Sequence, residues 1–160
     1  MALFGGPKKD DERGLRPGFR DLKWGDPPKK EMSVLDDTGE DRFCLLPNDD
    51  LTVNGAPVDR IIYKFWQGRL AEVLVEIPAA TADAVFKALV QEWGKPHRPN
   101  AFIEDYFWQN KKQGVEATSA AFSKNPGTKA ATLVVTSRYI QAKRMIVPVP
   151  AAPPASPPKP

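Results

Sequence analysis

The sequence predicts a small α+β domain, built on an antiparallel β-sheet with one main α-helix packed on one face. Short runs of apolar and β-branched residues, separated by turn residues, occupy most of the chain and are typical of strands. Only the stretch between Pro78 and Gly94 repeats its apolar residues at clear helical spacing. The order of strands, one helix and then more strands favours an antiparallel sheet over a parallel one.

Composition indicates one domain with unusual ends. The chain has 160 residues, of which 41% are hydrophobic and 27% charged, as in ordinary globular proteins. Its 17 prolines exceed the average share of about 5% and gather at the two ends. We therefore expect a flexible segment at 1–17, a single domain at 18–145 and a proline-rich, disordered tail at 146–160.

The proline-rich tail at 146–160 is restricted in its backbone conformation. Proline lacks the amide donor that helices and sheets need, so the tail should sample extended polyproline II. Such a segment is usually a spacer, although aromatic grooves also bind it. We favour a linker because no P-x-x-P sequence with a flanking basic anchor stands out.

Charge and cysteine content restrict the function only weakly. The formal net charge is +3, and acidic clusters interrupt the basic residues. A lone cysteine, Cys44, permits no intramolecular disulfide, which fits a reducing compartment. The sequence has no apolar run typical of a signal peptide or of a membrane helix. We expect a cytoplasmic protein, or an exported one if a leader has been removed.

Three short strands are expected in the first third of the chain. Phe19 and Leu22 enter the first, which stops at 24–28. The apolar run 43–46 indicates a buried strand, and 51–53 a strand that ends in the turn Asn54-Gly55.

The clearest element is a hairpin over 60–77 with its turn at Gly68. A two-residue turn would pair Phe65 with Leu70, whereas a type I turn with left-handed Gly68 would pair Phe65 with Arg69. The second register is favoured because it puts most apolar residues on one face, namely Ile61, Tyr63, Phe65, Ala71, Val73, Val75 and Ile77.

A helix of about 13 residues should follow the hairpin and cover its apolar face. Thr81 is its expected N-cap, and Gly94 and Pro96 should end it. Three further strands are expected at 102–109, 115–122 and 131–137, the last of them rich in β-branched residues.

Chemistry-bearing residues are sparse. His97 lies between prolines, and Cys44 in an apolar run, so neither indicates a catalytic role. The acidic cluster 36–41 lacks the ligand spacing of a calcium loop, and phosphate-binding glycine motifs are absent. We expect no catalytic residue, metal or cofactor.

Four tryptophans raise the possibility of a binding surface. Trp93 lies on the apolar side of the expected helix and is assigned to the core. Trp24, Trp66 and Trp108 lie at a chain bend, a tight turn and a strand, and they are the candidate partner-binding residues.

Several motifs resemble those of small bacterial α+β domains of uncharacterised function. In that group an F-x-x-x-x-W-G segment precedes a Y-x-F-x-x-G-R-L-x-x-V hairpin and a helix ending in W-G-x-P. This chain matches over about 19–137, at Phe19, Trp24, Gly25, Tyr63, Phe65, Gly68, Arg69, Leu70, Val73, Trp93, Gly94 and Pro96. The resemblance implies a fold and no activity.

The preferred interpretation is a non-enzymatic binding or protein-interaction module with an unidentified protein partner. One alternative is association with nucleic acid through Lys111, Lys112, Lys143 and Arg144, which added salt would weaken. A second is a small enzyme that uses the carboxylates of Glu104 and Asp105 with Tyr106. Adjacent strand residues point to opposite faces, which counts against that carboxylate pair.

Overall fold

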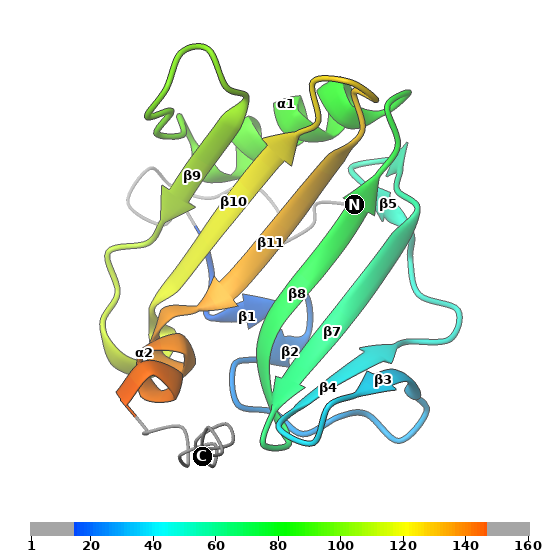
Figure 1. The fold of residues 1–160 in the computed structure, drawn as a ribbon, viewed down its shortest axis with the longest axis vertical. Helices are drawn as coiled ribbons and strands as arrows, with labels where there is room; N and C mark the ends of the chain where they lie inside the picture. Colours follow the sequence, from blue (N-terminus) through cyan, green and yellow to red (C-terminus); the bar gives the residue numbers. More distant parts are fainter. Residues whose placement is uncertain (1–14, 147–160) are drawn as a thin grey trace, which may run out of the picture.

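Seven strands form one antiparallel sheet in the computed structural model, which describes residues 15–146 (Figure 1). The tails predicted at 1–17 and 146–160 therefore lie largely outside the described residues. From one edge to the other the strands are β3 (Ser33–Asp37), β4 (Asp41–Leu45), β7 (Arg60–Trp66), β8 (Arg69–Ile77), β11 (Ala131–Ser137), β10 (Thr118–Lys124) and β9 (Asp105–Gln109).

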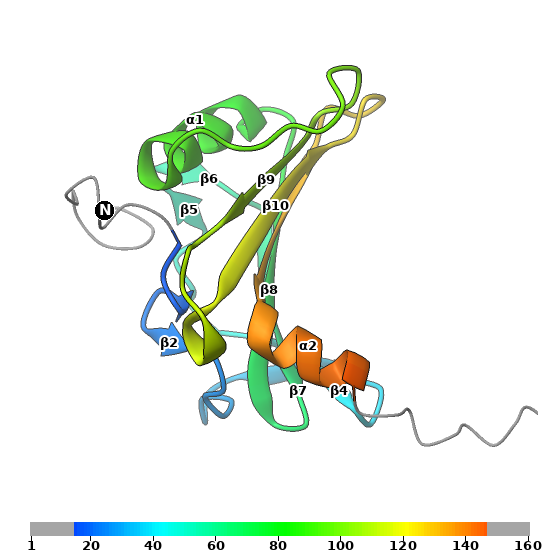
Figure 2. The ribbon, with the colours of Figure 1, turned by 90° about the vertical axis from the view of Figure 1, so that its left-hand side faces the viewer.

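Two helices lie on opposite sides of this sheet (Figure 2). The longer, α1 (Ala82–Trp93), covers one face, and α2 (Arg138–Ile146) projects from the other face at the end of β11. The predicted α+β class, a largely antiparallel sheet with one main helix, is confirmed. The second helix and the strand β3 were not predicted.

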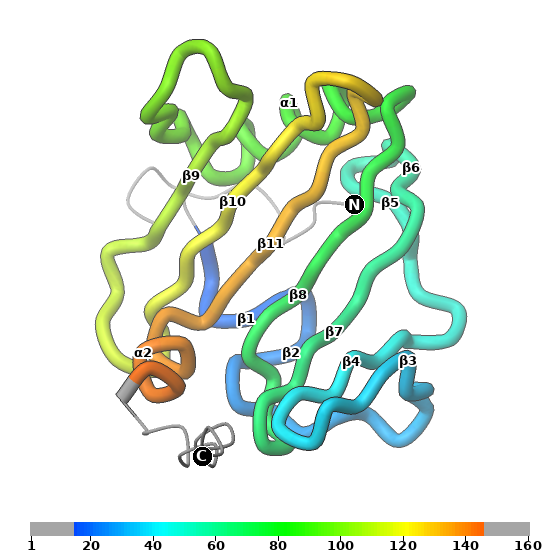
Figure 3. The backbone as a smooth tube through the Cα atoms, in the orientation of Figure 1, coloured from blue at the N-terminus to red at the C-terminus, as the bar shows by residue number. Residues whose placement is uncertain are grey.

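Two small hairpins complete the layer that holds α1. They are β1 (Gly18–Phe19) with β2 (Leu22–Lys23), and β5 (Thr52–Val53) with β6 (Ala56–Pro57). The tube in Figure 3 shows β1 and β2 behind the lower half of the sheet. Phe19 and Val53 are buried in the core, and Leu15 is buried as well, three residues before the predicted start of the domain.

The core lies between α1 and the face of the sheet beneath it. Alternate residues of the central strands point to this face, because side chains of a strand alternate between its two sides. Val85 and Leu89 of α1 are fully buried, as are Val73, Val75, Leu133, Val135 and Phe122 of the sheet. This is the amphipathic packing that the periodicity of α1 predicted.

The β7–β8 hairpin follows the first predicted register at its turn and neither predicted register beyond it. The turn has two residues, Gln67 and Gly68, with φ of 50° and 77°, so Phe65 pairs with Leu70 rather than with Arg69 as predicted. An irregularity then adds one residue to β8, so that Tyr63 pairs with Val73.

This bulge puts Val73, Val75 and Ile77 on the predicted apolar face but removes Ala71 from it. Ala71 instead packs with Trp66 and Ile140 in a second cluster.

The ends of α1 match the prediction in position but not in every contact. Thr81 precedes the first residue of the helix, yet its hydroxyl donates to the carbonyl of Pro57 at 2.6 Å and does not cap the helix. Gly94 adopts φ of 86° after the last turn, and its amide donates to the carbonyl of Val90.

A buried polar network joins the small hairpins to the sheet. The hydroxyl of Tyr63 donates to Oδ2 of Asp49 at 2.8 Å, and Nη1 of Arg20 donates to Oδ1 of the same carboxylate at 3.0 Å. Burial, followed by the adjacent Asp49, raises the pKa of Tyr63 far above its usual value. The hydroxyl therefore stays protonated and remains a donor.

Replacing Tyr63 by Phe should lower the free energy of unfolding by about 1.5–3 kcal/mol, because the carboxylate of Asp49 loses one of its three donors, which are Tyr63, Arg20 and the amide of Asp50. Chemical denaturation measures the change. Tyr106→Phe is the matched control: its hydroxyl makes only a 3.4 Å contact with Glu104, so its loss should be clearly smaller. Equal losses in the two variants would contradict a special role for the Tyr63 network.

The turn between β7 and β8 offers a second test. Both turn residues have positive φ, which suits Asn-Gly better than Gln-Gly. Gln67→Asn should raise the free energy of unfolding by about 0.5–1 kcal/mol, and Gly68→Ala should lower it by about 1 kcal/mol. Thermal unfolding of the two variants checks the opposite signs, and shifts of the same sign would show that the turn has another geometry.

Candidate binding pocket

Residues of α2 and of the β7–β8 turn help to line a pocket of about 600 Å³. These two elements lie at the lower end of the sheet in Figure 1. Its volume lies in the range of small-ligand pockets. The lining combines aromatic and aliphatic side chains with two cations: Trp24, Gly25, Trp66, Gln67, Arg69, Val115, Ser137, Tyr139, Ile140 and Lys143. Two of the three candidate tryptophans, far apart in sequence, thus line one pocket.

Trp24 is fixed in the pocket wall by backbone bonds of the residues that follow it and by a hydrogen bond of its indole ring. The amide of Gly25 donates to the carbonyl of Leu70 at 2.9 Å, and the amide of Leu70 donates to the carbonyl of Asp26 at 2.8 Å. The indole Nε1 of Trp24 donates to Oγ1 of Thr118 at 2.7 Å. Thr118 is fully buried, and its own hydroxyl donates to the carbonyl of Arg16.

Trp66 forms the inner wall, and α2 forms the opposite side. Trp66 is only 7% exposed and packs with Ala71 and Ile140. The guanidinium of Arg144 lies 5.9 Å from the centroid of the Trp66 ring and bonds to Oδ2 of Asp41 at 3.0 Å. Helix α2 is thereby attached to the sheet by one apolar contact and one ion pair.

The start of α2 is determined by Ser137 and Arg138. The amide of Ile140 donates to Oγ of Ser137 at 3.1 Å, which makes Ser137 an N-cap. The guanidinium of Arg138 donates to the carbonyl of Asn110 at 2.7 Å and to its Oδ1 at 3.0 Å. A serine three residues before an apolar residue was a signal in the sequence that could have indicated this helix.

The rim of the pocket is cationic. Arg69 and Lys143 are exposed, and the ammonium of Lys143 lies 4.9 Å from the centroid of the Tyr139 ring. The lining residues include no aspartate or glutamate. An apolar group that carries negative charge, or accepts hydrogen bonds, would therefore find complementary chemistry there.

The third candidate, Trp108, does not share this pocket. It is 5% exposed, stacks edge-on against Trp93 at 5.3 Å and donates from Nε1 to the carbonyl of Gly94. These contacts place the ring in the main core beneath α1. Tyr139 and Lys143 of α2 take part in the pocket instead. The sequence did not indicate Tyr139, and it named Lys143 only as a candidate nucleic-acid contact, because it did not predict the helix.

The structure separates His97 from Cys44. His97 forms backbone bonds with Phe107 beyond the outer edge of β9, whereas Cys44 lies in β4. Five strands, β7, β8, β11, β10 and β9, lie between these two residues, which corresponds to more than about 24 Å. Burial also raises the pKa of the Cys44 thiol, which disfavours the nucleophilic thiolate.

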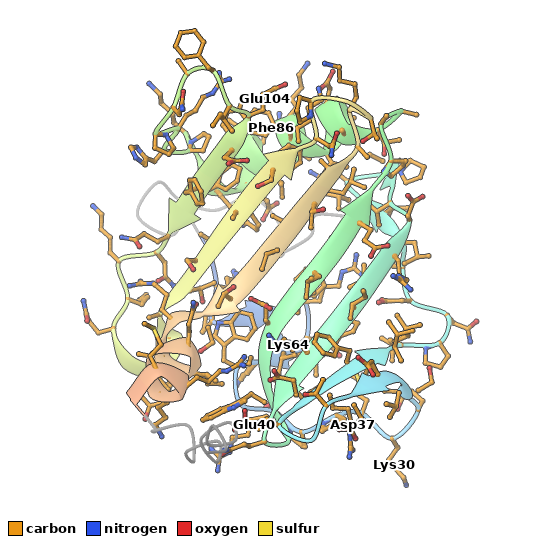
Figure 4. The ribbon with its side chains drawn as sticks, in the orientation of Figure 1. Lys30, Asp37, Glu40, Lys64, Phe86 and Glu104 are labelled. Carbon is orange, nitrogen blue, oxygen red and sulfur yellow. The ribbon has the colours of Figure 1, made fainter. Side chains whose placement is uncertain are left out.

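Of the residues considered for catalysis, Glu104 and Tyr106 lie close together at the upper end of the sheet (Figure 4). The hydroxyl of Tyr106 contacts Glu104 at 3.4 Å, while its ring packs on Phe86 at 4.4 Å; Figure 4 labels Phe86 and Glu104 at the upper end of the sheet. In the acidic segment 36–41, Asp37 accepts bonds from the amide of Gly39 and from Arg42. Within residues 15–146, no group of three or more metal-ligating side chains is placed to hold a metal ion.

Comparison of the chain with protein-family models, with curated proteins and with solved structures gave no match. Among the described residues, no helix is both long and apolar enough to cross a membrane.

Thr118→Val tests how Trp24 is positioned. The substitution keeps the shape of the side chain but removes the oxygen that accepts from Trp24 and donates to Arg16, so we expect the free energy of unfolding to fall by about 1–3 kcal/mol. In NMR spectra the indole N–H signal of Trp24 should move. Thr136→Val is the control, because Thr136 is half-exposed and its hydroxyl bonds only to Glu72. An unmoved Trp24 signal would refute the positioning role.

Proposed function

We propose that this protein is a non-enzymatic binding module whose ligand places an apolar group in the pocket and an acidic or hydrogen-bond-accepting group at its rim. The observation that carries the proposal is the meeting of Trp24 and Trp66 in one pocket bordered by Arg69 and Lys143. Aromatic residues and arginine are the types enriched at energetically important binding positions. The natural ligand on this proposal is an acidic protein segment with an apolar side chain as its anchor.

Binding rather than catalysis is supported by the lining itself. General acid–base chemistry needs a histidine or carboxyl group within hydrogen-bond reach of the substrate. The lining offers neither, and its one buried hydroxyl, that of Ser137, accepts the amide of Ile140. An enzyme using Glu104 and Asp105 would have to work at the other end of the sheet.

The nucleic-acid alternative uses a different set of contacts. Lys111 and Lys112 are exposed in the loop between β9 and β10, whereas Arg144 is engaged by Asp41. Binding of an oligonucleotide that weakens steeply with salt and depends on Lys111 and Lys112 would favour this alternative over ours.

A fluorescent probe with the proposed chemistry provides the test. Anilinonaphthalene sulfonate has an aromatic body and one negative charge, and its emission rises in apolar surroundings. The double variant Arg69→Glu/Lys143→Glu should bind the probe about five- to tenfold more weakly than the unaltered chain, because two exposed cations become repulsive anions. Titration followed by fluorescence measures the affinity.

The matched control is Lys30→Glu/Lys87→Glu, which makes the same change in net charge at exposed sites. Lys30 lies beside β3 and β4, away from α2 (Figure 4), and Lys87 lies on α1. This control should retain the affinity of the unaltered chain. Equal weakening in both double variants would mean that net charge, and not the pocket, governs binding, and the proposal would fail.

We also propose that the chain belongs with the bacterial group that its motifs resemble and that it is cytoplasmic.

A further inference from the structure

The pocket rim is rich in hydrogen-bond donors. The guanidinium of Arg69 and the ammonium of Lys143 can only donate, whereas the amide of Gln67 can both donate and accept. The side chains that line the pocket include no carboxylate to accept bonds in return. The best partner for such a rim presents many acceptors, few donors and an apolar body.

Residues 147–160 of this chain have that chemistry. Seven of these fourteen residues are proline, and each proline offers a carbonyl acceptor but no N–H donor. The stretch 147–158 has no charged side chain, so the cations of the rim do not repel it. Proline-rich segments in polyproline II bind grooves lined by aromatic rings, and this pocket has three: Trp24, Trp66 and Tyr139.

The position of α2 brings this segment close to the pocket. Lys143 lines the pocket, and Ile146, the last described residue, follows it by three positions, a rise of about 4.5 Å along the helix. Fourteen residues of polyproline II span about 43 Å, far more than the chain needs to turn back. Tethering at this range gives an effective concentration of about millimolar, so weak binding suffices.

We favoured a linker because no P-x-x-P sequence with a flanking basic anchor stands out in the proline-rich segment. Binding at this pocket does not need such a basic anchor. Such an anchor pairs with an acidic groove, whereas Arg69 and Lys143 make this rim basic. The missing anchor therefore fits the pocket instead of counting against it.

We propose that residues 147–160 bind in the aromatic pocket of their own chain, so that an external ligand must displace them. This inference rests on the proposed function, because it concerns the same pocket. It adds a specific occupant, the proline-rich segment, and a consequence, competition between that segment and the external ligand.

The test keeps the full chain and replaces all seven prolines of 147–160 by serine. With the segment no longer preorganised, the pocket should be free more often, and anilinonaphthalene sulfonate should bind at least about threefold more tightly. In NMR spectra the indole N–H signals of Trp24 and Trp66 should move, while those of Trp93 and Trp108, which lie in the core, should not. Lys159→Ala, the control, should change neither readout.

Unchanged probe affinity together with unchanged indole signals would overturn the inference. The proposed function would still stand if Arg69→Glu/Lys143→Glu weakened the probe, so the two failures are distinguishable. A synthetic peptide of residues 147–160, added to the variant whose seven prolines in 147–160 are serine, should displace the probe.

Dilution separates binding within one chain from exchange between two chains. Indole signals that stay constant on dilution support binding in the same chain. Signals that change with protein concentration would show that the segment enters the pocket of a second copy, and binding within one chain would then be wrong.

Discussion

One extra residue in β8 lets the hairpin have both a two-residue turn and an apolar core face, which a regular hairpin of this sequence could not have together. The two-residue turn at Gln67-Gly68 sets Phe65 opposite Leu70, and a regular ladder would then put Glu72 opposite Tyr63 in the core. The bulge shifts the pairing by one, so that Val73 takes that place. The core face of β8 remains apolar along its whole length because of this single irregularity.

The same bulge places Ala71 on the opposite face of the sheet, where α2 packs. Ala71 leaves the core face and packs with Trp66 and Ile140, so the turn end of the hairpin becomes a platform for the helix. Ion pairs reinforce it, since Asp41 binds Arg144 and Lys64 lies 3.5 Å from Glu72. The pocket exists because the hairpin, the helix and the Trp24 segment meet at this platform.

Two sets of polar contacts, made by Thr118 and by Arg138, fix the walls of the pocket, although neither residue lines it. Thr118 is among the few fully buried polar residues described, and it joins Trp24 to the chain near Arg16. Arg138 ties α2 to the loop that carries Asn110. A wall held by such distant contacts is preorganised, and preorganisation reduces the entropy lost when a ligand binds.

A pocket that prefers acceptors over donors suits both an external acidic segment and the chain's own proline-rich residues. If both bind there, as we propose, binding of one excludes the other, and the apparent affinity of an external partner is its intrinsic affinity multiplied by the fraction of pockets that are free. A module of this kind can be adjusted by changing its tail while the pocket stays intact. The tail and the pocket are joined through α2, whose residue Lys143 lines the rim.

Local chemistry by itself determined the strands with β-branched runs, the helix α1 and the Asn54-Gly55 turn, because each depends on periodicity or on backbone preferences of adjacent residues. The tertiary structure alone decided β3, whose five residues are all exposed, and α2, a polar helix held by contacts of Ile140 and Arg144 with the sheet. It also decided which tryptophans meet. Trp24 reaches Trp66 through backbone bonds between Gly25 and Leu70, and no pattern within either segment encodes that pairing.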